Sequence, residues 1–111
     1  FNGRNHLYME SLFNLLKRYL DEMKNMELAF YKQNDINSVL EEDAIDHLLE
    51  KLIRREVRVE ALSGLLNQDF EPGLKLVREK TGKNRFFINR DALRFPEGYI
   101  AGILKQNPAM T

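Results

Sequence analysis

The residues with the clearest chemical potential are the cations and phenylalanines of the stretch 75–94. The cations are Lys75, Arg78, Lys80, Lys83, Arg85, Arg90 and Arg94. Phe86, Phe87 and Phe95 stand among or directly after them. Lysine and arginine neutralise phosphates with release of counterions, and exposed aromatic rings stack on unpaired bases, so these seven cations are candidate nucleic-acid contacts. Because phenylalanine is usually buried, the favoured alternative is a solvated basic loop whose phenylalanines belong to the core.

The sequence contains no clear catalytic motif. Nucleophilic catalysis needs a nucleophile beside a base, and the only histidines are His6 and His47. Asp43, His47 and Glu50 share one face of a helix and could supply part of a metal site, but no second histidine or cysteine completes four ligands. Neither a GxxxxGK[ST] nor a GxGxxG spacing is present. We therefore expect no enzymatic activity, metal or cofactor in this chain, although a parent protein could be an enzyme.

The composition is typical of one globular domain spanning residues 1–111. The chain is 43% apolar and 31% charged, and it has no cysteine. No stretch approaches the roughly eighteen consecutive apolar residues that cross a membrane, so we expect no membrane partner and a cytoplasmic location. The chain opens with Phe1 where an initiator methionine would stand. We therefore expect it to be part of a larger protein.

The charges are balanced overall but segregated along the chain. Residues 41–71 hold nine acids and four bases, a net charge of minus five, and residues 73–95 hold seven bases and two acids, a net charge of plus five. Such blocks either offer acidic and basic faces to different partners or pack together and neutralise each other. The sequence leaves both interpretations open.

The strongest structural signal is an apolar repeat in the first thirty residues. Its members are Met9, Leu12, Leu16, Tyr19, Met23, Met26 and Phe30. An apolar residue at every third or fourth position predicts one long helix, from about Asn5 to Lys32. Phe13 and Leu20 widen the stripe to that of a helix facing a globular core. The seven repeat residues form the predicted partner-helix face.

Capping signals predict where the following helices begin and end. Ser38 followed by Glu41 matches a capping box and predicts that a second helix starts there. The connection over residues 33–37 is short, which predicts an antiparallel hairpin of the first two helices. Charged residues around Arg55 interrupt the apolar stripe, and we expect two separate helices to meet at that point.

The C-terminal part permits two interpretations. Leu74–Glu79 and Arg85–Asn89 predict a β-hairpin, which we favour. The alternative is a short helix from Pro72 to Thr81 that Gly82 stops, because proline at the start and glycine past the end are ordinary helix punctuation. A last helix is predicted after Pro96.

Together these signals predict a mainly α fold. A long N-terminal helix in an antiparallel helical hairpin is followed by a third short helix, a small C-terminal β-hairpin and a terminal helix. The helical part covers 1–68, and the basic hairpin and last helix cover 73–107. The predicted function is a non-catalytic interaction or assembly domain whose first helix docks on a protein partner or a second copy. The alternative is a nucleic-acid-binding module that uses the segment 75–94.

Overall fold

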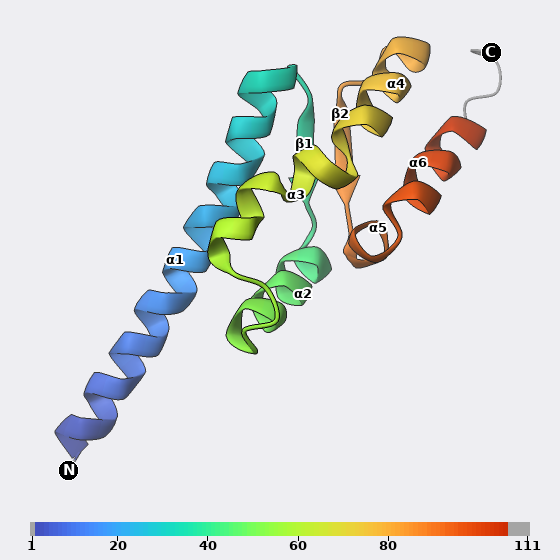
Figure 1. The fold of residues 1–111 in the computed structure, drawn as a ribbon. Coiled ribbons are helices and arrows are strands. Elements are labelled where there is room, and N and C mark those ends of the chain that lie inside the picture. The colour runs from blue at the N-terminus through green and yellow to red at the C-terminus, as the bar shows by residue number, and fades with distance from the viewer. Residues whose placement is uncertain (1, 107–111) are drawn as a thin grey trace.

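The fold is organised around one long N-terminal helix. The computed structural model describes the backbone of residues 2–106 and the side chains of residues 11–106. Helix α1 runs from Asn2 to Asn34, which is about 50 Å at 1.5 Å per residue. The molecule measures 65 × 24 × 18 Å along its principal axes. The N-terminal half of α1 projects away from the other elements, and the C-terminal half packs against them (Figure 1). The prediction of one unbroken helix is confirmed.

The remaining elements follow α1 in a compact group. In chain order they are β1 (Asn37–Leu40), α2 (Glu42–Ile53), the 3-10 helix η1 (Val59–Ala61), α3 (Leu62–Asp69), α4 (Glu71–Thr81), β2 (Arg85–Ile88), α5 (Arg90–Arg94) and α6 (Pro96–Lys105). The two strands form a parallel sheet in which Asn37 pairs with Arg85 and Leu40 with Ile88. Helices α2, α3 and α4 make the crossover between the strands.

The predicted β-hairpin is wrong, and its helical alternative is confirmed. Residues 74–79 lie within α4, which starts at Glu71, has Pro72 in its first turn and ends at Thr81. Gly82 follows with a φ of 79°, a left-handed conformation that a residue without a Cβ adopts freely. Strand β2 therefore finds its partner in β1, far away in the sequence, and the two run parallel.

The predicted capping box is also wrong. Ser38 lies in β1 with its side chain buried, and α2 begins only at Glu42. Ile36, Ser38 and Leu40 are buried while Asn37 is exposed, which is the alternation of a strand with one face on the core. Burial of that face outweighs the local capping signal. Since a strand intervenes between α1 and α2, the predicted antiparallel hairpin is not confirmed.

The predicted break near Arg55 is confirmed. The N–H of Glu56 donates to the carbonyl of Lys51 at 2.9 Å, and the N–H of Arg55 donates to that of Leu52 at 3.1 Å. This pair of hydrogen bonds is the Schellman motif, which ends a helix on a left-handed residue. Arg55 takes that conformation, with a φ of 61°.

The core lies where the C-terminal half of α1 meets the sheet and helices α2 to α5. Its buried members are Met23, Met26, Phe30, Ile36, Leu40, Ala44, Leu48, Leu52, Leu62, Leu66, Phe70, Leu74, Val77, Phe86, Ile88 and Ala92. Helix α6 covers one side of this core through half-buried side chains that include Tyr99 and Ile100. A Cβ at Gly73 would lie 2.7 Å from Cγ1 of Ile100, so α4 and α6 approach as closely as they do only because this residue is glycine.

Candidate interaction surfaces

The predicted partner-helix face of α1 divides into a buried part and a projecting part. Met23, Met26 and Phe30 belong to the core of their own chain. Tyr19 is half-buried and packs against that core. Met9 lies outside the residues whose side chains are described. The predicted partner-helix face therefore enters the folded domain at Tyr19. Its earlier residues lie on the helix before Tyr19, which we call the projecting part of α1.

The projecting part of α1 carries apolar side chains that the rest of the chain leaves uncovered. Phe13 is 69% exposed. Leu12 and Leu16 are half-buried. Neither of these leucines packs against the core cluster, as far as residues 11–106 are concerned. Within the part of the chain that the structure describes, no other helix or strand runs beside α1 before Arg18, where the connection between α2 and η1 approaches it (Figure 1).

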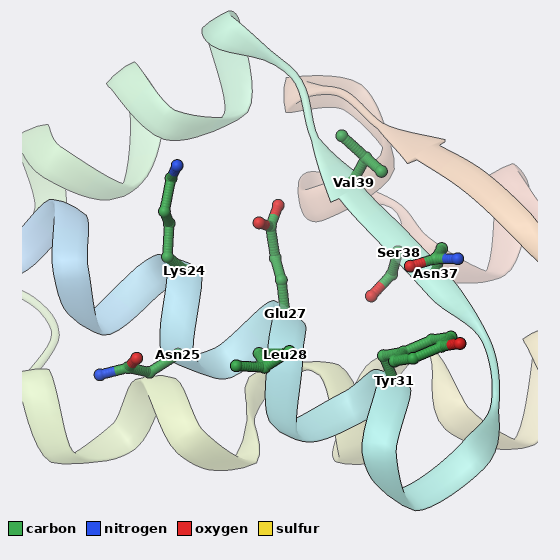
Figure 2. A pocket seen from close by; sticks show the side chains of 8 residues that line it. All are labelled: Lys24, Asn25, Glu27, Leu28, Tyr31, Asn37, Ser38 and Val39. Atoms are coloured by element: carbon green, nitrogen blue, oxygen red, sulfur yellow. The ribbon is translucent and has the colours of Figure 1, made fainter.

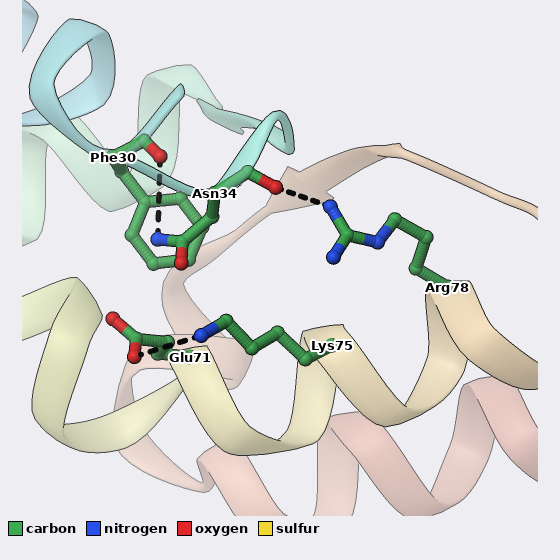
Figure 3. Close-up of polar contacts among 5 residues, drawn as sticks. All are labelled: Phe30, Asn34, Glu71, Lys75 and Arg78. Atoms are coloured by element: carbon green, nitrogen blue, oxygen red, sulfur yellow. Dashed lines mark hydrogen bonds and ion pairs between the residues drawn. The ribbon is translucent and has the colours of Figure 1, made fainter. Parts of the chain in front are cut away.

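The side chains of two of the seven predicted nucleic-acid contacts form an internal hydrogen bond or ion pair (Figure 3). The guanidinium of Arg78 donates a hydrogen bond to the carbonyl of Asn34, the last residue of α1. The side-chain amide of Asn34 donates to the carbonyl of Phe30 at 3.3 Å. Lys75 lies 3.3 Å from the carboxylate of Glu71, one turn earlier on α4. Arg78 thus donates to a carbonyl that has no hydrogen-bond partner within α1, because it lies at the end of the helix.

The five other predicted contacts are exposed but occupy several elements. They are Lys80 on α4, Lys83 in the following loop, Arg85 on β2, and Arg90 and Arg94 on α5. The segment therefore presents its charge as a distributed basic surface.

The phenylalanines of the basic segment differ in their environment. Phe86 is 3% exposed and belongs to the core, whereas Phe87 is 50% and Phe95 61% exposed. The guanidinium carbon of Arg85 lies 5.3 Å from the ring centroid of Phe87. Arg94 lies equally far from the centroid of Phe95. The alternative that placed the phenylalanines in the core is correct only for Phe86, because strand alternation turns Phe87 outward.

The acidic and basic segments meet where α2 faces α5. The N–H of Arg90 donates to the carboxylate of Asp43 at 3.1 Å. Desolvation lowers the pKa of His47, and the positive charges of Lys51, Arg90 and Arg94 lower it further. The two segments therefore pack against each other here, and the contact found between them is a hydrogen bond from a backbone N–H. Among the described residues, no group of three or more histidine, aspartate or glutamate side chains is arranged to hold a metal ion.

Tyr99 connects α6 to the outer edge of the sheet. Its hydroxyl donates to the carbonyl of Phe87 at 2.7 Å, and its ring meets the edge of Phe70 with a centroid distance of 6.1 Å. Burial, together with the charge of Glu41, raises the pKa of Tyr99 to about 12. The tyrosine therefore stays protonated, and this hydrogen bond stays intact, at neutral pH.

The opposite edge of the sheet borders a groove of about 460 Å³ between α1 and β1 (Figure 2). A carboxylate oxygen of Glu27 accepts a hydrogen bond from the N–H of Leu40 at 2.6 Å. The N–H groups of Asn37 and Glu41 bond toward β2, so that of Leu40 points to the open edge. Glu27 thus covers part of an edge that could otherwise pair with another chain. Sequence reasoning missed this role, because only the folded chain brings Glu27 to β1.

A second hollow, which we call the arginine cleft, lies where α1 meets the connection between α2 and η1. Its volume is about 400 Å³, and its lining residues are Arg18, Tyr19, Leu52, Arg55, Val57, Arg58, Val59 and Glu60. Three arginines thus line the cleft together with one glutamate. Arg18 is far from the other two arginines in the sequence, which is why sequence reasoning missed the cluster.

Comparison with known proteins adds no relative to this description. No protein-family model, no curated protein sequence and no solved structure matches the chain. Over residues 2–106, no helix is both long enough and apolar enough to cross a membrane.

Proposed function

We propose that this chain is a non-catalytic assembly domain that joins a second copy of itself through the projecting part of α1. The observation that supports the proposal is the set of apolar side chains on a helical stretch without an accompanying element. Phe13 is largely exposed, and Leu12 and Leu16 are half-buried without packing on the core of residues 11–106. Helices in proteins gain most of their stability from tertiary packing, which this stretch lacks within its own chain.

The spacing of these residues suits a helical partner. Leu12 and Leu16 belong to the predicted partner-helix face, which enters the domain at Tyr19. The residues of this face follow one another in the alternating three- and four-residue steps of a coiled coil. Two copies related by a two-fold axis would present the same surface to each other, so one patch suffices for both. Each leucine fully removed from water contributes about 1.5–3 kcal/mol, so a few such residues on each chain provide appreciable affinity.

Replacing Leu12 and Leu16 together by lysine is expected to weaken self-association at least about 100-fold, because four leucine side chains leave the dimer interface. Sedimentation equilibrium of the wild-type chain and the double variant over a micromolar concentration series measures the difference. At a concentration low enough to keep both chains monomeric, the melting temperature should stay close to that of the wild type, since neither leucine packs on the described core.

The matched control is Leu76→Lys, which places the same charge on an exposed position of α4. This variant should associate like the wild type. A wild-type chain that remains monomeric at high micromolar concentration contradicts the proposal, as does a double variant that associates unchanged.

A second candidate function, the binding of single-stranded nucleic acid, rests on the exposed rings of Phe87 and Phe95. Stacking on an aromatic face and contact with a nearby arginine suit an unpaired base and its phosphate. If the basic surface works in this way, Lys83→Gln with Arg85→Gln should lower the slope of log affinity against log salt by about 1.4 for a single strand. Fluorescence anisotropy of a labelled oligothymidylate measures that slope.

The control for this experiment is Lys75→Gln, because Lys75 is already engaged by Glu71. It should leave the slope nearly unchanged. Equal effects of the control and the double variant, or an affinity that does not depend on salt, would exclude the nucleic-acid candidate.

A further inference from the structure

We propose that the arginine cleft is a binding site for a small phosphate-bearing molecule. Arg18 reaches it from α1, while Arg55 and Arg58 reach it from the connection between α2 and η1. With Glu60 as the one acidic residue in the lining, the cleft carries a net charge of plus two. The site borders the assembly surface, because Arg18 is the last residue of the projecting part of α1, but the proposal does not depend on dimer formation.

The three guanidinium groups are available to a ligand. For residues 11–106, the ion pairs found are Lys51 with Glu56, Arg54 with Glu50 and Lys75 with Glu71. None of these pairs involves an arginine of the cleft, although Arg54 is the immediate neighbour of Arg55. The nearby acids Glu50 and Glu56 are thus already engaged by other cations, and among the described lining residues Glu60 alone offsets part of the positive charge.

The backbone at Arg55 provides an independent reason to regard the site as functional. Arg55 occupies the left-handed position of the Schellman motif, with a φ of 61°. Glycine is the usual residue there, because a Cβ makes the left-handed conformation costly. The same conformation is held by Gly82 at the end of α4 and by Asp35 after α1, and both residue types tolerate it better than arginine does. We take the presence of an arginine in a conformation that favours glycine as support for a use of its side chain.

The chemistry of the lining favours phosphate over a simple carboxylate partner. A guanidinium presents a planar fork of donors that matches two oxygens of a phosphate group, and several arginines together suit its higher charge. Val57, Val59 and Leu52 supply an apolar surface for an organic group, and the phenol of Tyr19 adds a polar atom at the wall. The volume of about 400 Å³ lies in the range of small-molecule sites.

The test is calorimetric titration of the full chain with inorganic pyrophosphate. The wild type should show saturable binding at one site, and Arg18→Gln and Arg58→Gln should each weaken it about 10-fold or more, as expected for the loss of a charged hydrogen bond. Arg54→Gln is the matched control: it removes the same charge next to the cleft from a residue that does not line it, and should leave the affinity within about 2-fold.

Arg55→Gly separates ligand binding from structural support. Relief of the left-handed strain should raise the melting temperature by about 4 °C, while loss of the guanidinium should weaken pyrophosphate binding about 10-fold or more. A lower melting temperature combined with unchanged binding would overturn the role assigned to Arg55.

Three results would overturn the proposal as a whole. The first is the absence of saturable pyrophosphate binding by the wild type. The second is an equal loss of affinity in Arg54→Gln, which would show that only the general positive charge of this region attracts the anion. The third is tighter binding of an oligoglutamate peptide than of pyrophosphate, which would identify an acidic protein segment as the occupant.

Discussion

Phe70→Ala is expected to lower the free energy of unfolding by about 3–5 kcal/mol. Phe70 is fully buried at the junction between α3 and α4, and the edge of its ring meets Tyr99 of α6. Truncation removes this contact and leaves a cavity at the point where three helices converge. Domains of this size are stable by only about 5–15 kcal/mol, so the loss is a large fraction of the total.

Chemical denaturation monitored by circular dichroism measures the effect of Phe70→Ala. Phe95→Ala serves as the control, because it removes the same side chain from a largely exposed position and should cost less than about 1 kcal/mol. Similar losses in the two variants would mean that Phe70 is not the packing centre that its burial indicates.

Arg78→Met is the second substitution with a large expected effect, a loss of about 1.5–3 kcal/mol in the free energy of unfolding. Methionine keeps much of the aliphatic stem but cannot donate a hydrogen bond to the carbonyl of Asn34. Because Asn34 is buried at the end of α1, its carbonyl has little access to replacement water. The contact is also one of the polar links between α4 and α1, so its loss loosens two elements at once.

Lys75→Met provides the matched control for Arg78→Met. It removes a cation one turn earlier on α4 whose ion pair with Glu71 is open to solvent. Such pairs contribute about 0–1 kcal/mol, so the control should unfold close to the wild type. Equal destabilisation of the two variants would contradict the assignment of a structural role to Arg78.

The elements that could be predicted from sequence are those whose signals are local. The repeat through Leu16, Met23 and Phe30 specifies α1, because each apolar residue needs only its own helix to reach the same face. The interruption near Arg55 and the proline that starts α6 are equally local. Each of these predictions agrees with the structure, since tertiary contacts reinforce the local preference.

The predictions that failed concern segments whose structure depends on contacts with residues far away in the sequence. Ser38 and Glu41 have the spacing of a capping box, yet strand pairing with residues 85–88 and burial of Leu40 place Ser38 in a sheet. In the segment 74–79, Leu74 and Val77 are buried while Leu76 is exposed, which is a helical spacing.

The candidate sites show the same division. The apolar side chains before Tyr19 could be named from the sequence, because a helix face is defined by spacing alone. The arginine cleft could not, since it depends on how the turn after α2 packs beside Arg18. Likewise, nothing in the sequence near Glu27 indicates that its carboxylate reaches the N–H of Leu40.

The parallel pairing of β1 with β2 has a consequence for synthesis of the chain. Contacts between residues far apart in sequence form slowly, because closing the intervening loop costs entropy before the contact is gained. On the ribosome, β1 emerges well before residues 85–88. The N–H and C=O groups of β1 that bond to β2 therefore stay unpaired until those residues have been translated. Chains that terminate before Arg85 therefore retain an unsatisfied strand, and such truncated products should aggregate.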